Sequence, residues 1–111
     1  MTATPLKPLE LELIRSIFRR HPEVTSATLF GSRATGTHSD RSDVDLVVTG
    51  QVDPLRAEAI ASELDELPLP YRFEVQPLAH IHSQSLLEHI RRVGILIYPA
   101  DAISAEMSVE G

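Results

Sequence analysis

The sequence contains no cysteine among its 111 residues. Disulfide bonds, thiolate metal ligands and a cysteine nucleophile are therefore all excluded. Long hydrophobic runs are lacking too: stretches such as Ile95–Tyr98 are far shorter than the roughly 20 apolar residues of a membrane-spanning helix. The first residues, Met1–Pro5, have neither the charged nor the apolar region of a secretory signal. We therefore expect a cytoplasmic protein that does not bind membranes.

Basic residues are also scarce, with 10 Lys and Arg against 16 Asp and Glu and a formal net charge of −6. A general nucleic-acid binder needs a basic face to neutralise phosphates, so this class is disfavoured. An anionic nucleotide remains possible if metal ions lie between it and the protein. The length suits one domain, because domains most often run to roughly 100–150 residues. We expect a single domain over residues 1–99 and a flexible tail over residues 100–111.

The chain does contain a regular alternation of helix and strand patterns, with no internal repeat. The apolar spacing and the capping residues predict three helices: residues 8–20, Pro54 (after an Asp53 N-cap) to before Pro68, and Ser85 to Gly94. The expected strands cover residues 25–30, 44–49, 71–76 and 95–98. This order predicts an α/β (α+β) fold, a mixed sheet of about four strands with helices packed against it.

Two aspartates stand at the start of the strand expected over residues 44–49. Side chains alternate along a strand, so Asp43 and Asp45 should share one face while Val44 and Leu46 occupy the other. Positions two apart lie about 6.5–7 Å from each other, close enough for the carboxylates to share one ion or to flank a pair roughly 3.5–4 Å apart. Such oxygen ligands suit Mg²⁺ or Mn²⁺. The alternative is two solvated acids at the mouth of a strand.

A Gly-Ser pair, Gly31 and Ser32, lies ten residues ahead of Asp43. Gly31 can adopt a positive φ and lets a phosphate approach the backbone, and Ser32 offers a hydroxyl and an amide to phosphate oxygens. A plain turn between two strands would also use Gly-Ser. Here a strand, a Gly-Ser turn, a polar loop and an Asp-x-Asp strand follow one another in this order. Together they favour a phosphate and metal site over a plain turn and a pair of solvated acids.

Further polar residues of the loop are candidates for the same site. Arg33 could contact a phosphate, and Ser42 could help to shape the loop together with Thr35 and Gly36. Equally, Arg33 could pair with Asp40 or face solvent.

A third carboxylate is expected on a neighbouring strand, because an attacking hydroxyl benefits from a metal-bound or general-base group. Glu74 is the candidate, on the polar face of the strand over residues 71–76. The alternative is a solvent-facing glutamate on an edge strand.

Four of the five histidines are considered as candidate site residues. His80 and His82 resemble a metal pair but have no evident third ligand, so we expect surface histidines. We expect His89, close to Arg91 and Arg92, at a solvated helix end, and only His38, within the loop, near a substrate.

Gly31-Ser32, ten intervening residues and Asp43-x-Asp45 resemble the signature of the DNA polymerase β-type nucleotidyltransferase superfamily. More narrowly, the chain is similar to the minimal nucleotidyltransferases, short antitoxins of prokaryotic toxin–antitoxin pairs. The likeness spans nearly the whole chain and includes a leading helix and the segments LFGSRATG, SDVDLVV, LPYRFEV and HIRRVGILIY.

This resemblance implies that Gly31 and Ser32 hold the nucleotide triphosphate, that Asp43 and Asp45 bind Mg²⁺, and that Glu74 takes the third acidic position as a metal ligand and catalytic residue. It implies transfer of AMP from ATP to a tyrosine of a HEPN-domain ribonuclease toxin, with which the protein would act as antitoxin and could form a hetero-oligomer.

The chain departs from this family pattern at two positions. The third acid is usually Asp, and the additional methylene of Glu74 extends its carboxylate by roughly 1.5 Å, a misplacement that can cost on the order of 10²-fold in rate. Thr35 stands where a second basic residue is common. The rival hypothesis is therefore a binding module that keeps the fold and neutralises its toxin by occlusion. Nucleotidylation of a small molecule is a third option, although such enzymes generally carry a further acceptor-binding domain.

Overall fold

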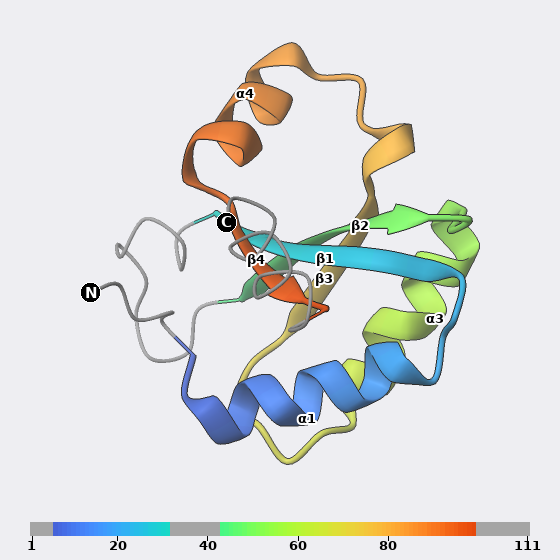
Figure 1. The fold of residues 1–111 in the computed structure, drawn as a ribbon, viewed down its shortest axis with the longest axis vertical. Coiled ribbons are helices and arrows are strands. Elements are labelled where there is room, and N and C mark those ends of the chain that lie inside the picture. The colour runs from blue at the N-terminus through green and yellow to red at the C-terminus, as the bar shows by residue number, and fades with distance from the viewer. Residues whose placement is uncertain (1–5, 32–42, 100–111) are drawn as a thin grey trace, which may run out of the picture.

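The computed structural model describes residues 6–31 and 43–99 (Figure 1). The helices are α1 (Pro8–Arg19), α3 (Pro54–Asp65), the short 3₁₀ helix η1 (Leu78–His80) and α4 (Gln84–Val93). The strands are β1 (Val24–Phe30), β2 (Val44–Gly50), β3 (Phe73–Pro77) and β4 (Ile95–Tyr98). The described elements thus follow the predicted order, with η1 as an addition.

The four strands form one mixed sheet in the order β3-β2-β1-β4. Strand β1 pairs antiparallel with both β2 and β4, whereas β2 and β3 run parallel. Helix α3 lies between β2 and β3 in sequence, which suits a parallel pair because its strands need a long crossover connection. The predicted mixed four-stranded α+β fold is confirmed.

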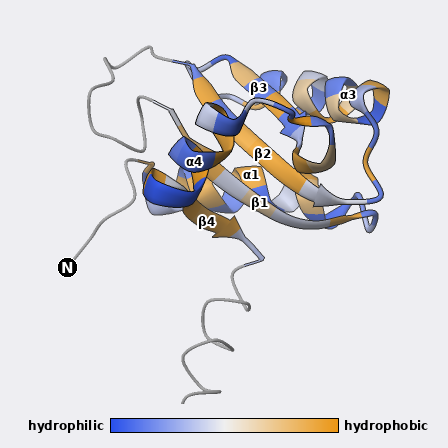
Figure 2. Ribbon diagram, turned by 90° about the horizontal axis from the view of Figure 1, so that it is seen from above, coloured by the Kyte–Doolittle hydropathy of each residue, from blue (hydrophilic) through white to orange (hydrophobic). Residues whose placement is uncertain are grey.

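Helices α1 and α3 lie on one side of the sheet and α4 on the other (Figure 1). The main core fills the space between the sheet and α1 and α3, and Figure 2 shows the apolar residues that β2 contributes. Val44 and Leu46 of β2 are fully buried in this core. Its members also include Ile14, Phe18, Ala27, Leu29, Val48, Ile60, Leu64 and Ile97. Most of the apolar burial is therefore on the side of the sheet away from α4.

A smaller apolar cluster lies on the α4 side of the sheet. It joins Phe30 of β1 and Val47 of β2 to Ile81 and to Ile90 of α4. Because Val47 lies between Leu46 and Val48 in sequence but belongs to the other cluster, β2 has the predicted alternation of faces.

Capping residues explain where two of the helices begin. The Asp53 side chain accepts a hydrogen bond from the Arg56 amide at 2.7 Å, as predicted for an N-cap. The predicted Ser85 cap of α4 is wrong, because Ser83 caps this helix by accepting from the Leu86 amide at 3.2 Å. The helix therefore starts earlier than expected, and Ser85 lies within its first turn.

Strand β3 is displaced from the expected range of residues 71–76. Tyr71 and Arg72 precede the strand, and the Tyr71 hydroxyl donates to a carboxylate oxygen of Glu10 on α1 at 2.9 Å. Asp65 accepts a hydrogen bond from the Phe73 amide at 2.9 Å, which ties the end of α3 to the start of β3. The strand position is thus set by contacts with both helices of the main core.

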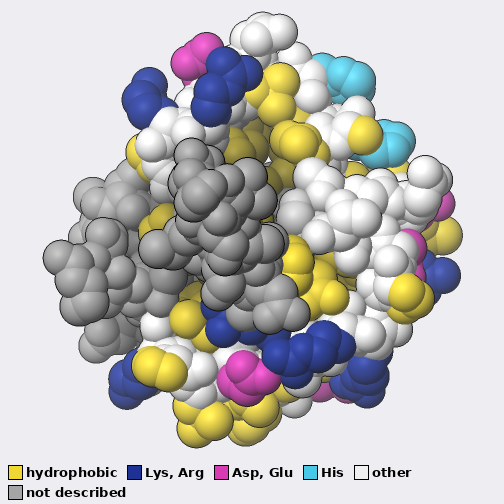
Figure 3. All heavy atoms as spheres, in the orientation of Figure 1, with side chains coloured by type: hydrophobic (Ala, Val, Ile, Leu, Met, Phe, Trp, Pro, Cys, Tyr) yellow, Lys and Arg dark blue, Asp and Glu magenta, His cyan; other side chains and the backbone are white. Residues whose placement is uncertain are grey.

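Basic side chains gather over α4 and over α1 on the face shown in Figure 3. Arg91 and Arg92 lie in the last turn of α4, and Arg19 lies in the last turn of α1. All three are exposed. The acidic protein therefore carries local regions of positive charge. Within the described residues, no helix has the length and apolar character needed to cross a membrane.

Candidate functional site

Two acidic residues face each other across strands β2 and β3. Asp45 of β2 and Glu74 of β3 are direct partners in the parallel register, so their side chains project from the same face of the sheet. Asp43 immediately precedes β2. Asp43 and Glu74 are exposed, and Asp45 is half-buried. Asp45 and Glu74 therefore lie side by side near the beginning of this parallel pair, with Asp43 just ahead of β2.

The electrostatic environment of Asp45 reflects this clustering of acids. Burial, the negative charges of Glu74 and Asp43, and a hydrogen bond with Glu74 together raise the pKa of Asp45 from 3.8 to about 6, and burial is the largest cause. Like charges disfavour each other's ionised forms. Within residues 6–31 and 43–99, no lysine or arginine forms an ion pair with Asp45 or Glu74. A divalent cation would relieve this repulsion.

A hollow of about 280 Å³ opens beside the acids. It is lined by Asp43, Asp65, Arg72, Phe73 and Glu74. Arg72 gives this otherwise acidic hollow a guanidinium, a group that matches phosphate oxygens well. The hollow thus combines carboxylates suited to a cation with a positive side chain suited to an anion.

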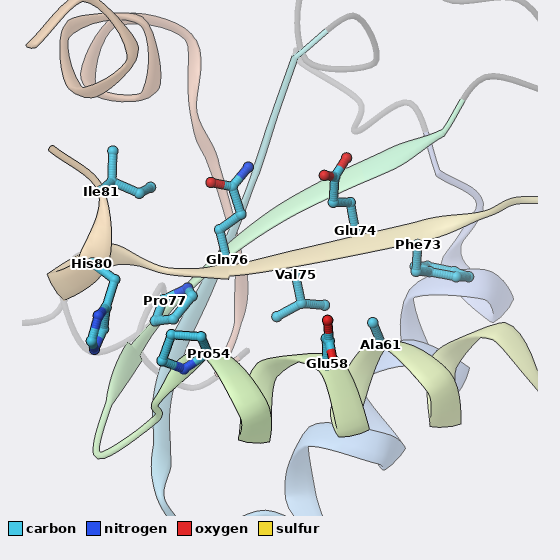
Figure 4. Close-up of a pocket in the computed structure, with 10 residues that line it drawn as sticks. All are labelled: Pro54, Glu58, Ala61, Phe73, Glu74, Val75, Gln76, Pro77, His80 and Ile81. Carbon is cyan, nitrogen blue, oxygen red and sulfur yellow. The ribbon is translucent and has the colours of Figure 1, made fainter. Parts of the chain in front are cut away.

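A second hollow, of about 450 Å³, runs along β3 and the adjoining part of α3 (Figure 4). It is lined by Pro54, Glu58, Ala61, Phe73, Glu74, Val75, Gln76, Pro77, His80 and Ile81. In Figure 4, Glu74 and Gln76 project to one side of β3, while Val75 points toward α3. Glu74 is among the residues that line both hollows.

Gly31 directly follows β1 and lies beside Asp45. Its φ is +84°, a positive value of the kind that glycine was expected to allow here. Phe30 is the Cα partner of Asp45, and a Cβ atom on Gly31 would collide with Oδ2 of Asp45. Glycine is therefore required here both by the backbone conformation and by the space that Asp45 occupies.

Several predicted site residues lie outside the described part of the chain. They are Ser32, Arg33, Ser42 and the loop residues Thr35, Gly36, His38 and Asp40. Their roles remain predictions.

His89 is a residue near the site that the sequence interpretation missed. Its Nε2 accepts a hydrogen bond from the Gly31 amide at 3.3 Å, and its ring meets that of Phe30 edge-on with centroids 6.4 Å apart. It is half-buried, so the expectation of a solvated helix end is wrong. Leu86 and Ile90 hold α4 against Phe30. A signal was present: His89 lies three residues after Leu86, a spacing that places both on the same side of a helix. His80 and His82 are exposed, as predicted.

The acids have the right chemistry for a hard divalent ion, because such ions bind carboxylate oxygens. The raised pKa of Asp45 fits a site that gains from a bound cation. The described residues contain no group of three or more acidic or histidine side chains already closed around an ion position. Metal binding by Asp43, Asp45 and Glu74 therefore stays a prediction that their chemistry supports.

The family model described as "Polymerase beta, Nucleotidyltransferase" matches residues 12–103. The chain belongs to this nucleotidyltransferase family. The predicted membership in the DNA polymerase β-type superfamily is therefore confirmed. No protein of curated function matches the chain significantly.

Solved structures of the same fold include components of toxin–antitoxin complexes. A chain from a toxin–antitoxin crystal structure with AMP-PNP has a TM-score of 0.67 and 20% identity, covering 91% of this chain and 82% of that one. A chain from the complex of the tri-AMPylated Shewanella oneidensis HEPN toxin with MNT antitoxin has a TM-score of 0.66 and 18% identity, covering 95% and 82%.

A more distant structure widens the comparison. A putative nucleotidyltransferase from Sulfolobus solfataricus has a TM-score of 0.51 and 17% identity, covering 79% of this chain and 75% of that one. At these identities the likeness establishes the shared nucleotidyltransferase fold.

Proposed function

We propose that this protein is a Mg²⁺-dependent nucleotidyltransferase that transfers AMP from ATP to a hydroxyl, most simply a tyrosine, of a HEPN-type toxin and thereby acts as its antitoxin. The observation that carries the proposal is the pairing of Asp45 with Glu74 across β2 and β3, beside Asp43 and without a compensating cation from the described residues. Family membership makes nucleotidyl transfer the chemistry that best suits this acidic site.

In this proposal the acids bind the metal and Glu74 also serves the acceptor. Asp43, Asp45 and Glu74 would hold Mg²⁺ or Mn²⁺, which neutralises charge on the triphosphate when bound. Gly31 and Ser32, with Arg33 and Ser42, would position the triphosphate. The acceptor oxygen forms a bond to the α-phosphorus as the bond to the bridging oxygen breaks, and pyrophosphate leaves. Glu74 takes the hydroxyl proton.

The position of Glu74 between two hollows supports this division of labour. The smaller hollow, which contains Arg72 and Asp43, suits the nucleotide, and the larger one along β3 has room for the acceptor side chain. The acceptor and the nucleotide would then meet at the Glu74 carboxylate. Holding two reactants in this way removes much of the entropy cost of a bimolecular reaction.

The choice of acceptor rests on the structural neighbours. One of them comes from a complex whose HEPN toxin is tri-AMPylated, and its similarity covers 95% of this chain. A second comes from a toxin–antitoxin structure with an ATP analogue. We extend ATP binding and AMP transfer to a HEPN toxin to this chain as part of the proposal.

Mass spectrometry of the partner tests the proposal directly. The purified protein is incubated with ATP, Mg²⁺ and the protein encoded beside it, and the partner is then weighed. We expect one or more AMP-sized increases in mass, no increase with D45N, and an unchanged increase with E66Q, which alters an exposed acid outside the cluster. No mass gain with the wild type, or an equal gain with D45N, would refute the proposal.

A second candidate function is neutralisation of the toxin by occlusion alone. It is favoured by Glu74 at a position where the family usually has Asp and by the absence of a closed ion position among the described residues. Rescue of toxin-expressing cells by the double variant D43N/D45N, equal to rescue by the wild type, would support this function over AMP transfer.

A further inference from the structure

The Gly31 amide is bound to a side chain from the far end of the sequence. Its N–H donates to Nε2 of His89 at 3.3 Å, across 58 positions of the chain. Gly31 is the last described residue before Ser32, and it contacts Asp45. One hydrogen bond from α4 therefore acts at the point where β1 leads into the proposed triphosphate turn.

This hydrogen bond restricts a residue that would otherwise have many conformations. Glycine samples positive and negative φ with similar ease and loses more entropy than other residues when it is fixed. The bond from the Gly31 N–H to His89 fixes the peptide plane between Phe30 and Gly31.

His89 is well suited to hold this amide because it is itself held. Its ring packs against Phe30 at an interplanar angle of 78°. The next residue, Ile90, is buried with Phe30 and Val47 in the smaller apolar cluster. A side chain on a packed helix keeps its position more closely than one on a loop.

We propose that His89 is a positioning residue for nucleotide binding: its Nε2 holds the Gly31 amide so that Gly31 keeps its place beside Asp45. The proposal rests on the proposed function insofar as that function makes Gly31 part of the triphosphate site. It adds α4 to the elements that build the site.

The hydrogen bond depends on one ring atom. Nε2 can accept from the amide only through its lone pair. A glutamine at this position keeps an acceptor oxygen at similar reach. A leucine keeps apolar contact with Phe30 but has no acceptor. Comparing H89Q with H89L therefore separates the effect of the hydrogen-bond acceptor from the effect of side-chain packing.

The experiment measures the affinity of the full chain for AMP-PNP with Mg²⁺ by calorimetry. We expect H89L to bind about three- to tenfold more weakly than the wild type, the effect of one hydrogen bond. H89Q should recover most of this loss. H82L, which replaces an exposed histidine, should match the wild type. In transfer assays, H89L should raise KM for ATP and leave kcat nearly unchanged.

Equal affinity of H89L and the wild type would overturn the proposal, as would equal losses in H89L and H89Q, because packing rather than the acceptor would then be responsible. If H89L does not fold, nitrogen–nitrogen coupling across the hydrogen bond in ¹⁵N-labelled wild type decides, and its absence at Gly31 refutes the contact.

The two proposals can fail separately. Nucleotide binding without AMP transfer would refute the proposed function. The relative AMP-PNP affinities of the wild type, H89L and H89Q would still test the role of His89. A wild type that binds no nucleotide would refute both.

Discussion

The protein contains two clusters of acidic residues that differ in what surrounds them. Glu23 and Glu63 flank His21, whose Nδ1 lies 3.2 Å from Glu23 and whose Nε2 lies 3.0 Å from Glu63. Arg56 lies 3.4 Å from Glu23. In the other cluster, Asp45 and Glu74 face each other with no basic partner among the described side chains.

The pKa values of the carboxyl groups follow this difference. The pKa of Glu23 is lowered, chiefly by a hydrogen bond from the backbone; burial opposes this shift, and His21 and Arg56 add to it. The pKa of Asp45 is raised to about 6 by burial and by the neighbouring acids. In the first cluster, basic side chains pair with the acids, and His21, just after α1, contacts Glu63 of α3. In the second, no described lysine or arginine forms an ion pair with Asp45 or Glu74, an arrangement that suits a cation-binding site.

The strongest test removes a charge from the cluster of Asp45 and Glu74. If the proposed function holds, D45N should lower the AMP transfer rate by on the order of 10³-fold, because the variant would remove a proposed metal ligand worth several kcal/mol in the transition state. Single-turnover transfer to the partner measures the effect. D53N, which alters the N-cap of α3 outside the cluster, is the control and should retain transfer per folded molecule. A rate for D45N within tenfold of the wild type would show that Asp45 is not a metal ligand.

Replacing the third acid should have a smaller effect. E74Q keeps the size of the side chain but cannot take the acceptor proton, so we expect turnover to fall by about 10²-fold. AMP-PNP affinity in the absence of the partner should change much less. E74D retains the carboxylate and should turn over faster than E74Q. Equal rates for E74D and E74Q would exclude proton acceptance by Glu74.

A mutation in the cluster around His21 should change the stability of the protein rather than its AMP transfer activity. H21L removes both hydrogen-bonding nitrogens of a buried ring and leaves Glu23 and Glu63 without it, so we expect the free energy of unfolding to fall by about 1–3 kcal/mol. Urea denaturation measures the change. Transfer per folded molecule should stay at the wild-type level, and a selective loss of transfer would contradict the division into two clusters.

The smallest expected effect is the pH dependence of stability in the metal-free protein. The raised pKa of Asp45 means that its protonated form stabilises the fold fully below pH 3.8, and that this contribution is lost as the pH rises through about 6. D45N should therefore exceed the wild type in unfolding free energy above pH 7, by on the order of 1 kcal/mol after allowance for solvent screening. The difference should shrink toward pH 4.

Urea midpoints at several pH values, without metal, provide this measurement. Mg²⁺ should stabilise the wild type more than D45N, since a ligand stabilises the folded state that binds it. A difference between the two proteins that stays constant with pH would contradict the role assigned to Asp45.

Much of the fold followed from local sequence patterns. Alternation in β2 correctly separated Val44 and Leu46 from Asp45, and the Asp53 cap correctly marked the start of α3. The cap of α4 was misplaced because Ser83 and Ser85 are equally good cap residues, and only the backbone path selects Ser83. Local rules therefore predict an element better than they predict its first residue.

The candidate site could be predicted in part for the same reason. The acids were found from their spacing, but the pairing of Asp45 with Glu74 depends on the register of β2 against β3, which no single segment encodes. His89 was missed because its contact with Gly31 arises only when α4 packs over Phe30. Both features depend on contacts between segments far apart in sequence, which local patterns do not encode.

The location of the main core on the opposite side of the sheet from α4 has a consequence for how such proteins can diverge. Residues such as Ile14 and Phe18, which secure the fold, share no face of the sheet with Asp45. Mutations that abolish chemistry can thus accumulate while the scaffold persists and continues to be recognised by other molecules. On the proposed function, a lineage with this architecture could replace an enzymatic antitoxin by one that only blocks its toxin without losing the fold.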